Sequence, residues 1–124
     1  MLARYLLPEH VARQDGSSSE VSLGSSRGKL LLLTLGITRI AEQESLELSF
    51  WGSADRENWK RLTTFPKKSY CGTYPLLLDL KRHPEVGYLR AEWRLSCWDQ
   101  GEGLAPLCGF YVTAEEPKFQ AVGA

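Results

Sequence analysis

The chain has 124 residues, 43% hydrophobic and 24% charged, which are ordinary values for one globular domain with its own core. Its 15 basic and 15 acidic residues cancel, so it lacks the basic excess that is typical of proteins that bind nucleic acid or anionic membranes. We therefore expect neither nucleic acid nor a membrane as a partner. A net charge of zero also leaves little repulsion between copies, which favours association.

The amino-terminal segment 1–8 is apolar, but it is too short and too interrupted for a secretory signal. The longest apolar run, within residues 30–37, is broken by a threonine and a glycine and falls short of the ~20 residues of a membrane-spanning helix. We expect a soluble chain that is cytoplasmic or associated with a larger particle, and the compartment stays open.

Residues 1–28 differ from the rest of the chain. Two stretches rich in Gly and Ser, at 14–19 and 23–28, have the composition of flexible connections, and residues 20–23 between them are compatible with a short strand. Two interpretations remain open: a terminal strand that pairs with the chain's own sheet, or an arm that docks on a neighbouring subunit. In the second case, the residues expected at the assembly interface are Tyr5, Leu6, Leu7, Val21 and Leu23.

From Lys29 onward, the hydrophobic pattern has a period of two, which is typical of strands that bury one face and expose the other. The alternating segments are 46–51, 76–80, 89–97 and 110–114, and turn-forming residues separate strands at 41–44, 53–58, 66–69, 83–87 and 99–106. This pattern predicts an all-β protein, an antiparallel β-sandwich of about 7–8 strands. The predicted organisation is a flexible arm at 1–28, a sandwich domain at 29–116 and a tail at 117–124.

One face of the predicted strand 89–97 carries Arg90, Glu92 and Arg94. Alternating charges on a sheet surface predict cross-strand ion pairs, here with Glu47 as the candidate partner, each contributing about 0.2–1 kcal/mol. We interpret this face as solvated, with a ligand site as the less favoured alternative.

The segment 46–59 places Ser53, Asp55 and Trp59 in a loop that follows a predicted strand. Asp55 is positioned to accept hydrogen bonds from the amides just ahead of it, and Trp59 is expected to fold back as an apolar plug. Together with the later Tyr-Leu-Arg strand that starts at Tyr88, this pattern resembles discoidin-like, galactose-binding-type sandwiches, in which a strand ends in a Ser-x-Asp-Gly-x-x-Trp loop. It is also similar to small uncharacterised bacterial and phage structural proteins.

The resemblance covers residues 46–114 and implies a jelly-roll or discoidin-like sandwich. The chain departs from it in two respects. Arg56 stands at the place of the loop glycine, where glycine permits a positive φ, and the bracketing cysteines of secreted discoidin domains are missing. No ligand residues are carried over, because binding loops vary among such sandwiches.

No catalytic, metal or cofactor site is predicted, and we expect that the chain is not an enzyme. His10 lies in the amino-terminal segment, and His83 lies in a turn without an accompanying nucleophile motif. Cys71, Cys97 and Cys108 lack the close spacing of metal ligands and are expected to be free thiols, with a Cys97–Cys108 bridge as the alternative.

The predicted function is that of a non-enzymatic structural protein whose subunits self-associate, or join another structural protein, into an oligomer, filament or shell. The physical reason is that the edge strands of a sandwich can pair with a strand from another chain. The alternative is a module that binds carbohydrate or another small ligand through exposed aromatic side chains. The candidates for stacking are Trp51, Trp98, Tyr70, Tyr74 and Tyr111.

Overall fold

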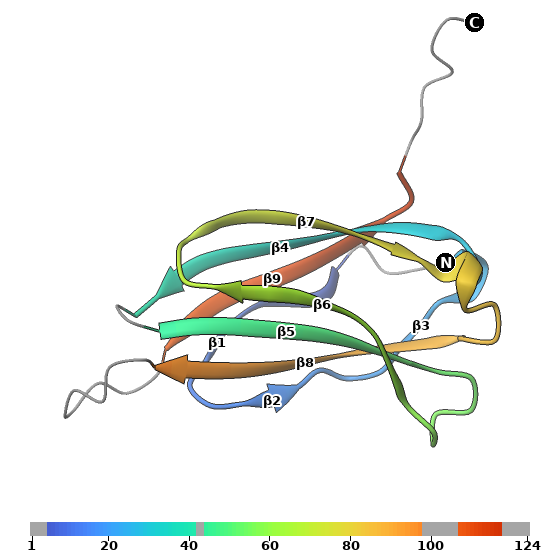
Figure 1. The fold of residues 1–124 in the computed structure, drawn as a ribbon, viewed down its shortest axis with the longest axis horizontal. Helices are drawn as coiled ribbons and strands as arrows, with labels where there is room; N and C mark the ends of the chain where they lie inside the picture. Colours follow the sequence, from blue (N-terminus) through green and yellow to red (C-terminus); the bar gives the residue numbers. More distant parts are fainter. Residues whose placement is uncertain (1–4, 42–43, 98–106, 118–124) are drawn as a thin grey trace, which may run out of the picture.

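The computed structural model describes residues 5–41, 44–97 and 107–117, and of Cys97 it describes the backbone. Figure 1 shows strands stacked in two layers, which confirms the predicted antiparallel β-sandwich. The strands are β1 (Tyr5–Ala12), β2 (Gly16–Ser17), β3 (Val21–Ser22), β4 (Leu30–Ile40), β5 (Glu44–Ser53), β6 (Lys60–Lys68), β7 (Gly72–Asp79), β8 (Tyr88–Cys97) and β9 (Cys108–Glu115). Two single-turn 3₁₀ helices, η1 (Gly24–Ser26) and η2 (Leu80–Arg82), follow β3 and β7.

The two sheets are both antiparallel. The first has four strands in the order β1-β9-β4-β7, and the second has five, in the order β2-β8-β5-β6 with β3 also paired to β8. From β4 onward, the chain crosses from one layer to the other at every connection except that between β5 and β6. The long strands β4, β5, β8 and β9 therefore lie in the interior of the sheets, and their side chains point alternately into the core and out to solvent.

The core lies between the two layers and consists of the side chains predicted from the period of two. In β4, the inward residues Leu31, Leu33, Leu35 and Ile37 are at most 3% exposed. In the facing sheet, Leu46, Leu48 and Phe50 of β5 are fully buried. Full burial of each such side chain contributes about 1.5–3 kcal/mol, so these positions decide which face of each strand turns inward.

The amino-terminal segment belongs to the sandwich. β1 pairs with β9, and Leu6 and Leu7 are buried against the chain's own core. The expected short strand within residues 20–23 is present as β3, and it is followed by the fully buried Leu23. The structure therefore confirms the first of the two interpretations that the sequence left open, because β1 is a terminal strand that pairs with the chain's own sheet.

Each long edge strand carries a proline: Pro8 in β1, Pro66 in β6 and Pro75 in β7. The remaining edge is formed by β2 and β3, which have two residues each. A proline has no N–H to donate to an incoming strand, and a two-residue edge offers almost no backbone to pair with. The predicted turn at 66–69 is therefore wrong over its first three residues, since β6 continues to Lys68. Proline does not end the strand there because an edge strand tolerates it.

Candidate functional site

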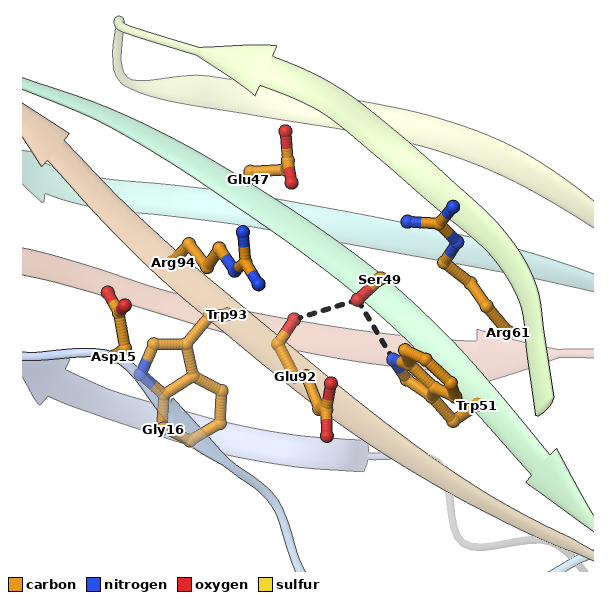
Figure 2. A pocket seen from close by; sticks show the side chains of 9 residues that line it. All are labelled: Asp15, Gly16, Glu47, Ser49, Trp51, Arg61, Glu92, Trp93 and Arg94. Atoms are coloured by element: carbon orange, nitrogen blue, oxygen red, sulfur yellow. Dashed lines mark hydrogen bonds between the residues drawn. The ribbon is translucent and has the colours of Figure 1, made fainter. Parts of the chain in front are cut away.

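The outer face of the five-stranded sheet carries a hollow of about 230 Å³ (Figure 2). Its floor is formed by the central strands β5 and β8, one side by β6, and the other by the segment that leads into β2. Figure 2 shows Trp51 and Arg61 at one end of the hollow and Arg94 and Glu47 toward the other, with Ser49 between them. The full lining is Asp15, Gly16, Glu47, Ser49, Trp51, Arg61, Glu92, Trp93 and Arg94.

Strand geometry places the polar lining on one face. Glu47, Ser49 and Trp51 are spaced by two along β5, so their side chains point to the same side of the sheet. In the pairing of β5 with β8, Glu47 lies opposite Arg94 and Ser49 lies opposite Glu92. The prediction that Glu47 neighbours the charged face of strand 89–97 is thereby confirmed.

The ion pair on this face differs from the predicted one. It runs along β8, with Arg90 Nη2 at 3.3 Å from Glu92 Oε1, and both side chains are partly exposed. Such a pair contributes about 0–1 kcal/mol. Glu47 and Arg94, although opposite each other in the register, do not form an ion pair within the described part of the chain. Their charged ends are therefore available to a ligand.

The indole of Trp51 is held in place by the strand beneath it. Its Nε1 donates a hydrogen bond to Ser49 Oγ at 3.1 Å, and Ser49 Oγ in turn donates to the backbone oxygen of Glu92 at 3.5 Å (Figure 2). The ring is half-buried, so it still presents part of its surface to the hollow. An aromatic surface fixed in this way loses less conformational entropy when a ligand stacks on it.

Arg61 reaches the hollow because of a β-bulge in β6. The pairing of Phe50 with Thr63 is followed directly by the pairing of Trp51 with Arg61, which leaves Leu62 as an extra residue. Strict alternation would turn Arg61 to the same side as Thr63, toward the core. The bulge instead turns Arg61 to the outer face beside Trp51. Sequence analysis missed Arg61 for this reason, since a bulge leaves no period-two signal.

The hollow contains charges of both signs. Its carboxylates belong to Asp15, Glu47 and Glu92, and its guanidinium groups to Arg61 and Arg94. Asp15 is tied to the sheet, because its Oδ1 accepts a hydrogen bond from the amide of Leu95 at 2.8 Å. Across residues 5–41, 44–97 and 107–117, neither Arg61 nor Arg94 has a hydrogen bond or ion pair through its guanidinium group. The site therefore offers free donors next to carboxylate acceptors.

The loop after β5 is organised around Asp55, as the sequence predicted. Asp55 Oδ1 accepts hydrogen bonds from the amides of Asn58 at 2.8 Å and Glu57 at 2.9 Å, and from the Ser53 hydroxyl at 2.9 Å. Oδ2 accepts a further bond from the Asn58 side chain at 2.8 Å. These bonds, the backbone N–H of Asn58 first among them, hold the pKa of Asp55 well below its usual range, because each favours the charged carboxylate.

Arg56 takes up the conformation for which the resembling loops use glycine. Its φ is 68°, the left-handed region that costs a residue with a Cβ about 1–2 kcal/mol. The side chain has two partners: its Nε donates to Glu20 Oε2 at 2.5 Å, and its guanidinium lies 5.5 Å from the ring centroid of Tyr88. Arg56 therefore keeps a positive φ although it carries a Cβ, and its side chain is held by these two contacts.

A second hollow, of about 220 Å³, lies beside this loop and reaches Val86. An ion pair between Lys60 and Glu85, both of which line it, joins the start of β6 to the turn before β8. The ring of Trp59 is half-buried, and the Arg90 guanidinium lies over it at 4.6 Å from the ring centroid. One face of the Trp59 ring is thus covered by a side chain of the protein itself, but the ring lines the hollow and does not pack against the core, so its role as an apolar plug stays a prediction.

The five residues expected at an assembly interface do not form one surface. Leu6, Leu7 and Leu23 are buried in the core of the chain itself. Tyr5 is 49% exposed and lies in the four-stranded sheet, whereas Val21 is half-buried in β3 of the other sheet. An interface through this segment would have to use Tyr5 and Val21 separately.

The predicted stacking aromatics are spread over the molecule. Trp51 lines the hollow, and Tyr111 lies in β9 of the other sheet. Tyr70, 78% exposed, and Tyr74 lie at the hairpin between β6 and β7, where the Tyr74 hydroxyl donates to the Tyr70 backbone oxygen at 2.6 Å. Trp98 lies outside the described residues. Of the four predicted residues that the structure describes, Trp51 alone lines the hollow.

Neither histidine and neither of the two described thiols, those of Cys71 and Cys108, lines the hollow. His10 packs against Phe110 and Trp93, with ring centroids 4.5 and 5.1 Å away, and His83 lies in the turn after η2. Cys108 carries a free thiol rather than the alternative disulfide bridge, and its burial raises its pKa to about 12. A thiol with this pKa holds little thiolate at neutral pH and is correspondingly unreactive.

Within the described residues, no three His, Cys, Asp or Glu side chains gather as metal ligands would. In the same part of the chain, no helix has the length and apolar character needed to cross a membrane.

Compared with models of protein families, with curated proteins and with solved structures, the chain matches none of them. The resemblance to discoidin-like sandwiches therefore remains a prediction.

Proposed function

We propose that the chain is a binding module that holds a neutral carbohydrate, about one sugar ring in size, on the outer face of the five-stranded sheet. The observation that carries this proposal is the anchored indole of Trp51 beside two guanidinium groups that have no partner among the described residues and the carboxylate of Glu47, all around one hollow. At about 230 Å³, the hollow lies just below the ~300–1,000 Å³ that is usual for drug-sized ligands.

The chemistry of the lining matches a sugar better than a charged ligand. A sugar ring has a C–H face that packs on an aromatic ring, and neighbouring hydroxyl groups that both donate and accept hydrogen bonds. Glu47 accepts such bonds, Arg61 and Arg94 donate them, and the Trp51 ring supplies the apolar surface. A strongly anionic ligand would meet the carboxylates of the lining, and a cationic one would meet the arginines.

Binding, rather than catalysis, is proposed because of what the hollow contains. Neither histidine lies in its lining, and neither described thiol does. Of its carboxylates, Asp15 is engaged with a backbone amide and Glu92 with Arg90, so both are committed to the sheet. We also prefer ligand binding to assembly by strand addition. Prolines and very short strands occupy the sheet edges of the described chain, where an incoming strand would have to pair.

The test is a glycan array, followed by calorimetric titration of the sugars that bind. Trp51→Ala should weaken binding about 10- to 100-fold, since loss of a stacked aromatic at a binding centre typically costs that much. Tyr70→Ala is the matched control: it removes a more exposed aromatic ring that does not line the hollow, and it should leave the affinity unchanged.

A second pair of variants tests the polar contacts. Arg94→Ala should weaken binding about 10-fold, whereas Arg82→Ala, which removes a highly exposed arginine from η2, should not. The proposal is wrong if the array shows no binding, or if the sugars that bind do so equally well to wild type and to Trp51→Ala.

A further inference from the structure

A third hollow, of about 350 Å³, lies on the outer face of the four-stranded sheet, where β1 and β9 pair. Its lining is formed by Tyr5, Pro8 and Glu9 of β1 and by Tyr111 of β9. We call it the tyrosine hollow. It shares no lining residue with the hollow proposed for carbohydrate, which lies on the other sheet. The two sites can therefore be tested independently.

Irregular pairing of β1 brings its three lining residues together. Relative to β9, β1 has one extra residue between Tyr5 and Leu7 and another between Leu7 and His10. In a regular strand, the neighbours Pro8 and Glu9 would point to opposite faces of the sheet. Beside these extra residues both are exposed, and both line the tyrosine hollow. The hydrophobic period of the sequence does not record such an arrangement.

The two tyrosine rings form a corner of aromatic surface. Their centroids lie 6.3 Å apart, and their planes meet at 69°. Tyr111 is held in place by its close approach to Gly36, where a Cβ atom would stand only 2.1 Å from Tyr111 Cζ. Tyr5 is 49% exposed and Tyr111 is half-buried, so both rings retain surface that a ligand can contact.

The charge of the tyrosine hollow is negative. Glu9 is exposed and contributes a carboxylate to the lining, and the described residues of that lining include no cationic side chain. Glu115 lies four residues beyond Tyr111 in β9, so it points to the same side of the sheet. The aromatic corner and this carboxylate both favour a cation, because the face of an aromatic ring carries partial negative charge.

We propose that the tyrosine hollow binds a quaternary ammonium group, a cation whose nitrogen carries methyl groups in place of N–H groups. The inference does not rest on the proposed carbohydrate site. A primary ammonium would give up hydration that the two rings and Pro8 cannot replace with hydrogen bonds. A quaternary ammonium makes no such demand: its methyl groups pack on Tyr5, Tyr111 and Pro8, and its charge is attracted by the rings and by Glu9.

The test is an NMR titration of the full chain, labelled with ¹⁵N, with choline and with 3,3-dimethyl-1-butanol. The second compound has the same shape but a carbon atom in place of the charged nitrogen. Choline should shift the amide signals of residues 5–9 and 111 with a Kd of ~1–10 mM, because the site is open to solvent. The neutral compound should bind at least ~5-fold more weakly.

The same group occurs in Nε-trimethyllysine, where it belongs to an amino acid. A parallel titration with this compound distinguishes the two sources of the group. Binding of either compound at the tyrosine hollow supports the proposal, and the tighter of the two identifies the source.

Variants separate attraction to the rings from simple apolar packing. Tyr5→Leu keeps an apolar side chain but removes the aromatic face, so it should weaken choline binding about 3- to 10-fold and reduce the preference over the neutral compound. Tyr70→Leu is the matched control, since Tyr70 is 78% exposed and does not line the hollow. Circular dichroism checks that each variant keeps its strand spectrum.

The carboxylate is tested in the same way. Glu9→Gln removes the charge but keeps the size of the side chain, and it should weaken choline binding about 3-fold. Glu57→Gln makes this change at an exposed position in the loop after β5 and should bind like wild type. The proposal is overturned if wild type does not bind either ammonium compound at ~50 mM, if the neutral compound binds as well as choline, or if Tyr5→Leu binds like wild type.

Discussion

The two outer faces of this sandwich share one core but have different chemistry. On the five-stranded sheet, the outward positions of β5 and β8 hold acidic, basic and aromatic side chains around a hollow. On the four-stranded sheet, the outward positions of β4, β7 and β9 hold mostly threonine, leucine, proline and tyrosine, with Asp79 and Glu115 at the ends of the strands. The inward positions of both sheets are alike, since both bury apolar side chains.

This difference shows which residues of a strand the core does not constrain. Burial determines every second residue of a strand, because a slip of one position would expose the whole apolar set. The alternate residues are not constrained by the core, so each sheet can present its own surface. We propose that the charged face binds a ligand.

The largest effect is expected from truncating a side chain in the core, which lies beneath both faces. Phe110 is fully buried between the sheets, with its ring 5.5 Å from that of Trp93. Phe110→Ala should lower the free energy of unfolding by about 3–5 kcal/mol, measured by urea denaturation, and both faces should be lost in one transition. A cost no greater than that of Thr34→Lys on the surface would contradict this.

The next effect concerns the outer face of the four-stranded sheet. Gly36→Val places a side chain where the Tyr111 ring lies, so the ring must leave the strand, and we expect a loss of about 1–3 kcal/mol in stability. The same change should leave carbohydrate binding intact, because Gly36 and Tyr111 lie in the other sheet. In a Tyr111→Ala background, Gly36→Val should cost much less, and an undiminished cost would show that the ring is not the obstacle.

A smaller effect on stability is expected in the loop after β5. At Arg56, with its positive φ, Arg56→Gly and Arg56→Ala both remove the contacts with Glu20 and Tyr88, but only alanine keeps the strain. Arg56→Gly should therefore be about 1 kcal/mol more stable than Arg56→Ala in thermal or urea unfolding. Equal stability of the two variants would mean that the loop relaxes to a negative φ.

The smallest effect on stability is expected from Asp55, in the loop after β5, and it depends on pH. The pKa of Asp55 is lowered in the folded state, so its hydrogen bonds stabilise the fold above the unfolded pKa of about 3.9 and this stabilisation is lost as the pH falls below that value. Between pH 6 and about pH 2, the urea midpoint should fall further for wild type than for Asp55→Asn. Parallel curves for the two proteins would remove Asp55 from the acid response.

Much of the fold could be predicted because it depends on local pattern. Alternation in residues 46–51 and 110–114 identifies the inward side chains of two strands whatever their neighbours are, and the buried positions match it. Asp55 and the amides of Glu57 and Asn58 are close in the chain, so their turn also follows from the sequence. Interactions of this kind need no knowledge of strand order.

The candidate site was less predictable because it combines strands distant in the chain. Asp15, Ser49 and Glu92 meet only through the pairing of the amino-terminal segment and β5 with β8. The available signal was the spacing of Glu47, Ser49 and Trp51 along one strand opposite the charged strand 89–97. This spacing by itself predicts ion pairs with the charged strand, and the aromatic character of Trp51 separately predicts a stacking residue.

Composition and period by themselves determined that this chain is a β-sandwich, because alternating hydrophobicity forces two apolar sheet surfaces together. Only the tertiary structure decided that residues 5–12 add a strand to the chain's own sheet, and that one extra residue, Leu62, turns Arg61 outward beside Trp51. The physical reason is that pairing register and bulges depend on contacts between distant strands, and the alternation of residues within a single strand does not record them.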